Sequence, residues 1–202
     1  MGNLAFRIES VQVLLPLLAG FAALLTVRAV RRRPGWYGKP VLTRLATALY
    51  AAGFLHFTMF PIIVDKTQNL SPWYNQIQPI PLAGLIGMDP TFVLNVLLFA
   101  PFGLLLPLLA KAELPVKRVA LRALVTSLTI ELVQLGMYVW FSNGRGADVD
   151  DLIANTLGGV LGCLILRSSA LSDLVRGFAP PGTALARSAT ETVPAPPAPV
   201  GR

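Results

Sequence analysis

The chain has 202 residues, of which 54% are hydrophobic and only 13% are charged, and its formal net charge is +7. Together with a mean hydropathy of +0.63, this composition is typical of an integral membrane protein and excludes an ordinary soluble enzyme. The basic residues do not form a face interleaved with aromatic side chains on a soluble fold, which excludes nucleic acid as a partner.

Five apolar segments are long enough to cross a bilayer, which takes about 20 residues in a helix. They are expected at residues 11–30, 42–64, 91–110, 119–141 and 151–171. Prolines in or near these segments are expected to be tolerated as kinks, as they are in other membrane helices. The apolar stretch at 77–87 is too short to cross, and we expect it to form an interfacial or re-entrant piece before the third long helix.

The fold class predicted by this pattern is an all-α integral membrane protein with about five transmembrane helices. We expect three regions along the chain. Residues 1–40 form an N-terminal transmembrane helix and a basic cytoplasmic loop, and residues 41–171 form the main membrane domain. Residues 172–202, which are rich in proline and alanine, are expected to be a disordered cytoplasmic tail.

The distribution of basic residues predicts the orientation of the chain, because Lys and Arg gather in cytoplasmic loops. Fourteen of the seventeen lie on one side of a five-helix arrangement, in the segments 28–44, 111–122 and 167–202. The other side carries only Arg7, Lys66 and Arg145. We therefore expect a multi-pass protein of the cell membrane, with its N-terminus outside and its C-terminus in the cytoplasm.

This topology brings polar residues that are distant in sequence to one level, near the outer surface of the membrane. Seven of them are candidate ligand-binding residues: Asn95, Glu131, Gln134, Arg145, Asp148, Asp151 and Asn155. A carboxylate within a membrane segment usually faces the bundle interior and is functional. The spacing of Gly158 and Gly162 allows another helix to approach closely.

Each of these residues also has a purely structural interpretation. Glu131 can form a buried ion pair with Arg145, Asp150 and Asp151 can cap the last long helix, and Asn95 can link two helices. Alternatively, the carboxylates and an asparagine can hold a divalent cation, and Arg145 can bind an anionic group. A glutamate in an apolar site can also act as a general acid or base. The sequence does not choose among these, and it identifies no cofactor.

Three motifs resemble the VanZ-like family: "NVLLFAPFG" at 95–103, "ELVQ" at 131–134 and "RGADVDDLIANTLGGVLG" at 145–162. Order and spacing agree with the family pattern over roughly residues 40–167. The resemblance implies a membrane protein of the bacterial cell envelope, in a family whose named member is associated with resistance to teicoplanin, a glycopeptide antibiotic.

Two functions of different classes follow. In the first, an outward-facing polar pocket engages an envelope or lipid-linked group, such as a cell-wall precursor, or the glycopeptide itself, and contributes to glycopeptide resistance. In the second, the protein is an intramembrane enzyme that modifies an envelope lipid or a lipid-linked sugar, with Glu131 or Asp151 as the acid/base. No inverted repeat that would favour a transporter is visible.

Overall fold

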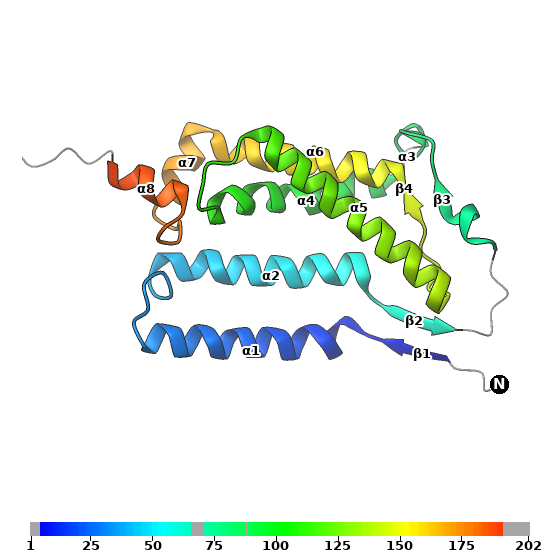
Figure 1. Cartoon of the computed structure of the whole chain (residues 1–202), viewed down its shortest axis with the longest axis horizontal. Coiled ribbons are helices and arrows are strands. Elements are labelled where there is room, and N and C mark those ends of the chain that lie inside the picture. Colours follow the sequence, from blue (N-terminus) through cyan, green and yellow to red (C-terminus); the bar gives the residue numbers. More distant parts are fainter. Residues whose placement is uncertain (1–4, 66–70, 88, 192–202) are drawn as a thin grey trace, which may run out of the picture.

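The computed structural model describes residues 5–65, 71–87 and 89–191, and most of these are helical. Five long helices make up the body of the protein (Figure 1): α1 (Ser10–Val30), α2 (Lys39–Met59), α4 (Pro90–Leu109), α5 (Val116–Phe141) and α6 (Val149–Arg167). Four of them, α1, α4, α5 and α6, are long and apolar enough to cross a membrane. The prediction of an all-α membrane protein is confirmed.

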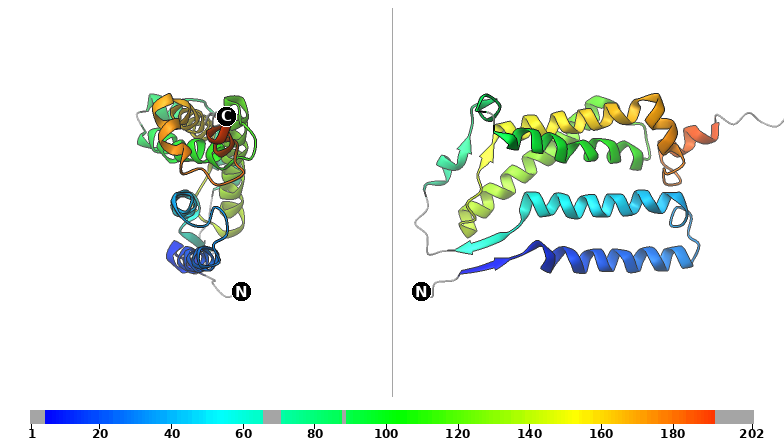
Figure 2. Two further views of the ribbon diagram at one scale, coloured as in Figure 1. Left: turned by 90° about the vertical axis from the view of Figure 1, so that its left-hand side faces the viewer. Right: turned by 180° about the vertical axis from the view of Figure 1, so that it is seen from behind.

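Helix α2 matches α1 in length, at 21 residues each, but it is not among the four spans. Its sequence carries Lys39, Arg44 and His56 together with several threonines, and these lower its hydropathy. Even so, α2 lies alongside α1 and antiparallel to it, and in the end-on view it stands between α1 and the other long helices (Figure 2). The expected fifth crossing therefore stays a prediction.

The second segment ends earlier than predicted. A helix was expected to continue to residue 64, but α2 stops at Met59, and strand β2 (Ile62–Asp65) follows it. Pro61 explains the difference, because proline has no N–H and disfavours helical backbone in the residue before it. Phe60 is accordingly extended. Strand β2 pairs antiparallel with β1 (Ala5–Ile8) beyond the ends of both helices.

Helices α4, α5 and α6 form a bundle, and the closest contact in it is between α4 and α6. Glycines make this contact possible. A Cβ atom added at Gly162 would lie 1.8 Å from the Ala100 carbonyl oxygen, and one added at Gly158 would lie 2.3 Å from the Val96 carbonyl oxygen. Small residues allow membrane helices to approach to this extent. The interpretation of the glycine pair as a contact surface is therefore confirmed.

The segment between α2 and α4 has its own short elements: the 3₁₀ helix η1 (Trp73–Gln76), strand β3 (Ile77–Gln78) and helix α3 (Ala83–Ile86). Strand β3 pairs in parallel with β4 (Ala147–Asp148), the short strand that leads into α6. These elements lie at the same end of the molecule as β1 and β2 (Figure 1). As expected, the apolar stretch at 77–87 does not form a crossing helix.

The last long helix is shorter than predicted, because α6 ends at Arg167 and not at residue 171. Two short helices follow where the sequence predicted the start of a disordered tail: α7 (Ser169–Arg176) and α8 (Ala184–Glu191). They are anchored to the bundle, since the Ala184 N–H donates to the Ala110 carbonyl at 2.9 Å. Two short helices thus stand at the start of the expected tail, while residues 192–202 lie outside the described residues.

Candidate functional site

A cavity of about 500 Å³ lies between α2, α4, α5 and the start of α6. Its lining residues on α2, α4 and α6 come from the ends of these helices that lie nearest the short strands (Figure 1). Six of the seven candidate ligand-binding residues line it: Asn95, Glu131, Gln134, Arg145, Asp151 and Asn155. Much of the remaining wall is apolar, including Leu94, Leu98 and Ile130. The structure therefore brings together residues that are up to sixty positions apart in the chain.

Asp148, the seventh candidate, is not part of the cavity wall. It is the N-cap of α6, and its carboxylate accepts a hydrogen bond from the Asp150 N–H at 2.8 Å. Its own N–H donates to Oε2 of Glu131 at 3.0 Å. Burial raises the pKa of Asp148, and the neighbouring charges of Asp150 and Asp89 act in the same direction. Asp148 thus caps α6 with its side chain, and its backbone N–H hydrogen-bonds the Glu131 carboxylate.

Asp150 has a role that the sequence did not reveal. Its side chain is 3% exposed, and its two carboxylate oxygens accept hydrogen bonds from the backbone N–H groups of Leu82 and Gly84. The Gly84 bond is 2.7 Å long. Asp150 therefore fastens the segment around α3 to the first turn of α6, where the helix dipole also favours a negative charge.

Glu131 and Asp151 place two carboxylates in the same cavity. Asp151 accepts a hydrogen bond from Nδ2 of Asn95 at 2.5 Å, which links α6 to α4. Both side chains belong to the wall of this cavity. The ion pairs in the described part of the chain are Arg7–Glu9 and Arg176–Asp173, so no basic side chain there neutralises this pair.

Arg145 does not pair with Glu131, and the structural alternative proposed from the sequence is wrong on this point. The guanidinium group instead donates to three backbone carbonyls at the end of α2: Phe57 at 3.3 Å, Thr58 at 2.9 Å and Phe60 at 2.8 Å. A cation is favourable there because the C-terminal end of a helix carries partial negative charge. Burial lowers the pKa of Arg145 from its ordinary value.

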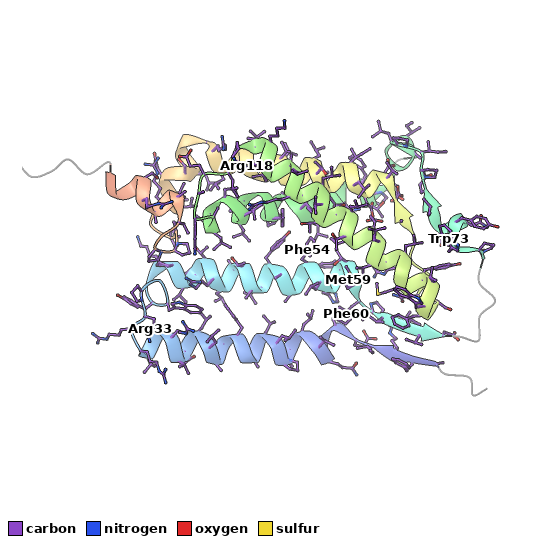
Figure 3. The ribbon with its side chains drawn as sticks, viewed as in Figure 1. Arg33, Phe54, Met59, Phe60, Trp73 and Arg118 are labelled. Carbon is purple, nitrogen blue, oxygen red and sulfur yellow. The ribbon has the colours of Figure 1, made fainter. Side chains whose placement is uncertain are left out.

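Gln134 supports the same end of α2, since its Nε2 donates to the Thr58 carbonyl at 2.8 Å. Figure 3 shows Met59 and Phe60 at this end of α2, close to where the helix gives way to β2. Together, Gln134 and Arg145 fix the α2 wall of the cavity to α5 and to the loop before α6. Both residues line the cavity, but the groups that they hydrogen-bond are backbone carbonyls at the end of α2.

Asn155 has an unsatisfied hydrogen-bonding atom. The residue is 4% exposed, and its Nδ2 donates to Oγ of Ser127 at 2.8 Å. Its Oδ1 is buried and has no hydrogen-bond partner. Buried polar atoms in native proteins are nearly always satisfied, and an exception calls for an explanation such as a bound ligand. The unpaired oxygen belongs to a residue that lines the cavity.

A divalent cation is one of the chemistries that the sequence left open. Within the described residues, no group of three or more His, Cys, Asp or Glu side chains is arranged to hold a metal ion. The groups that a cation would meet in the cavity are the carboxylates of Glu131 and Asp151 and the amide oxygens of Asn95 and Asn155. Hard cations such as Mg²⁺ bind oxygen ligands of these kinds.

Comparison with known protein families gives a match to VanZ/LLP1 over residues 42–172. This range takes in all but the first three residues of α2, the segment with the short elements, and the whole α4–α6 bundle. The chain belongs to the VanZ/LLP1 family. The resemblance seen in the three sequence motifs is thus confirmed, and all six cavity residues named above lie within the VanZ/LLP1 region. No curated protein and no solved structure matches the chain.

Proposed function

We propose that this VanZ/LLP1 protein acts in the bacterial cell envelope and binds the polar head of an envelope amphiphile in the cavity between α2, α4, α5 and α6. The observation that carries the proposal is the unpaired Oδ1 of Asn155, a buried acceptor in the wall of a cavity. An unsatisfied buried acceptor costs about 1–3 kcal/mol. A ligand that donates a hydrogen bond to this oxygen would recover that energy.

The other groups in the cavity indicate the chemistry of the head. Glu131 and Asp151 present carboxylate oxygens and have no cationic partner in the described residues. Arg145, expected from the sequence to contact an anion, directs two nitrogens at backbone carbonyls. The cavity is thus rich in acceptors. It suits a head that carries hydroxyl or ammonium donors better than a bare phosphate.

The proposed orientation places this cavity at the outer face of the membrane. Basic segments such as the α1–α2 loop, which includes Arg33, lie at one end of the molecule, while Trp73 and the short strands lie at the other (Figure 3). Because basic loops stay in the cytoplasm, the cavity end would face outward. A test is Asp148→Cys in a Cys163→Ala background, with Arg33→Cys as the matched control on the opposite side. A membrane-impermeant thiol reagent should label intact cells through residue 148 and not through residue 33, and the reverse pattern would contradict the orientation.

A protein that holds envelope amphiphiles at the outer face would alter how a glycopeptide reaches its target, and this is our proposed link to teicoplanin resistance. The test is teicoplanin susceptibility of a sensitive Gram-positive host that carries empty vector, wild type, Glu131→Gln or Glu113→Gln. Glu113 is an exposed glutamate at the opposite end of the bundle and controls for the chemical change. Wild type and Glu113→Gln should protect, and Glu131→Gln should not, at matched membrane levels. Equal protection by all three would contradict a role for the cavity.

The presence of Glu131 and Asp151 in one cavity also favours the second function, an intramembrane enzyme that acts on an envelope lipid or a lipid-linked sugar. Two adjacent carboxyl groups can share one proton, and such a pair can donate or accept that proton during a reaction. The test is lipid profiling of cells that express wild type or Asp151→Asn. A new lipid species that depends on Asp151 supports the enzyme, whereas unchanged lipid chemistry with intact protection supports binding alone.

A further inference from the structure

An apolar groove runs along the interface of α2 with α4, and neither Glu131 nor Asp151 lines it. Its first part, about 490 Å³, has walls that include Ala46, Tyr50, Leu97, Leu104 and Ile165. A second part, about 360 Å³, continues toward α7, with walls that include Leu42, Leu108, Val175 and Phe178. We call these two parts together the α2–α4 groove.

The groove borders the polar cavity. Leu97 lines both the cavity and the first part of the groove. Ala46, Leu104 and Leu105 line both parts of the groove. A chain that passes over Leu97 from the polar cavity would therefore reach the groove and could follow it toward the opposite end of α2.

The walls of the groove offer no unsatisfied hydroxyl group. Tyr50 donates its hydroxyl to the Leu98 carbonyl at 2.9 Å, and Thr43 donates to the Phe178 carbonyl at 2.8 Å. This is the opposite of the cavity, where Asn155 holds an unpaired buried oxygen. A polar ligand would gain nothing in the groove, whereas a hydrocarbon chain would leave no polar atom unpaired.

The length of the groove indicates what kind of chain it fits. The groove follows α4 from Leu97 to Leu108, which at 1.5 Å per residue is about 17 Å. The hydrocarbon core of a bilayer is about 30 Å thick, so that each leaflet contributes about 15 Å. A tail that fills the groove thus spans about one leaflet.

From this shared wall at Leu97 we propose that the α2–α4 groove holds the single hydrocarbon tail of the same amphiphile whose head occupies the polar cavity. The inference rests on the proposed function and names its ligand class: a one-tailed lipid with a donor-bearing head. A helix from a second copy of the chain is the alternative occupant, and the cross-linking outcome below tests it.

The tail determines where the lipid lies on the protein and contributes little to the binding affinity. Lipid tails are as apolar as the leucines of the groove, so a tail gains little hydrophobic free energy by leaving the bilayer. Affinity comes from the head and its acceptors, and the groove selects which lipid can place its head there. Blocking the groove should therefore exclude long-tailed ligands while the cavity itself remains intact.

The experiment uses the full-length protein in nanodiscs of phosphatidylcholine and phosphatidylglycerol. The probe is a photoactivatable long-chain amino diol with a diazirine in its tail, whose amine and hydroxyls are donors. Ala46→Trp fills the groove at a residue shared by both of its parts. Ala51→Trp adds the same bulk at an exposed position of α2 outside the groove. Glu131→Gln tests the head site separately, and labelled peptides are mapped by mass spectrometry.

In wild type and Ala51→Trp, labelling should fall on α2 residues 42–50 and α4 residues 97–105. Ala46→Trp and Glu131→Gln should each lower this labelling about tenfold, equivalent to about 1.4 kcal/mol. If Glu131→Gln lowers it and Ala46→Trp does not, the tail assignment is overturned and the head site stands. If Glu131→Gln labels like wild type, or if wild type does not label above the lipid background, the proposed function fails. Cross-links between two copies through the groove would also overturn the tail assignment.

Discussion

Replacing Gly162 with alanine tests how the contact between α4 and α6 holds the cavity together. The added Cβ would lie 1.8 Å from the Ala100 carbonyl oxygen, whereas ordinary contacts begin at 3.4 Å. The two helices must then separate by up to about 1.6 Å at this point, which is the difference between these two distances. The Asn95–Asp151 hydrogen bond, 2.5 Å long, crosses the same interface about three turns away along α6. If the helices move apart as rigid rods, a shift of that size reaches Asp151 and breaks the bond.

The expected cost of Gly162→Ala has two main contributions. Overpacking a close contact costs about 1–3 kcal/mol, and losing a hydrogen bond to a charged group costs about 1.5–3 kcal/mol. Alanine recovers about 1 kcal/mol through its higher helix propensity. The net destabilisation is about 3 kcal/mol, which for a chain of this size lowers the Tm by about 6–12 °C.

The assay is the thermal stability of the detergent-purified protein, measured as the fraction that remains monodisperse after heating. Gly53→Ala is the matched control, because a Cβ added there has no neighbour within 4 Å. It should be neutral or stabilising by up to about 1 kcal/mol. If Gly162→Ala were as stable as Gly53→Ala, the close contact between α4 and α6 would be refuted.

Further predictions concern the polar residues around the cavity. Arg145→Gln should lower stability by about 3 kcal/mol, because it removes charged donors from the end of α2, and an unchanged Tm would contradict the carbonyl contacts. Asp150→Asn should speed hydrogen exchange at the Leu82 and Gly84 amides at least about tenfold, since a charge-assisted bond is about twice as strong as a neutral one; exchange like that of wild type would show that the segment is held in another way. Asn155→Leu should change stability by less than about 1 kcal/mol, because removing the unsatisfied buried oxygen offsets the lost hydrogen bond to Ser127, yet it should abolish protection against teicoplanin. A large loss of stability would instead mark Asn155 as structural.

Much of the fold could be predicted, because bilayer-spanning helices leave a strong hydropathy signal. The first and third long segments were placed within one residue at each end, at Ser10–Val30 and Pro90–Leu109. The errors occurred where local chemistry overrides hydropathy. Pro61 ends α2 and directs the chain into β2, although "PIIV" reads as apolar membrane sequence. Likewise α8 packs on the end of α4, although its composition is typical of a tail.

The sequence could predict which residues gather at the candidate site, but not which groups each of them contacts. Topology alone placed Asn95, Glu131 and Asp151 at one level, and the structure brings them around one cavity. The sequence could not show that Arg145 faces the end of α2, because that depends on how the loop before α6 is folded. Nor could it separate the neighbouring aspartates, of which Asp150 faces α3 while Asp151 faces the cavity. Helical phase was the available signal, but these residues stand at the start of the helix, where the phase is poorly defined.

The central claim is that an acceptor-rich cavity binds the donor-bearing head of a lipid, and the most direct measurement is the identity of the lipids that remain bound during purification. Native mass spectrometry would compare wild type, Glu131→Gln and the control Glu113→Gln, all prepared from the same cells. We predict that wild type and Glu113→Gln retain a one-tailed amphiphile with an amine or several hydroxyls in its head, and that Glu131→Gln loses it. The same retained lipids in all three proteins, or none beyond bulk phospholipid, would contradict the account.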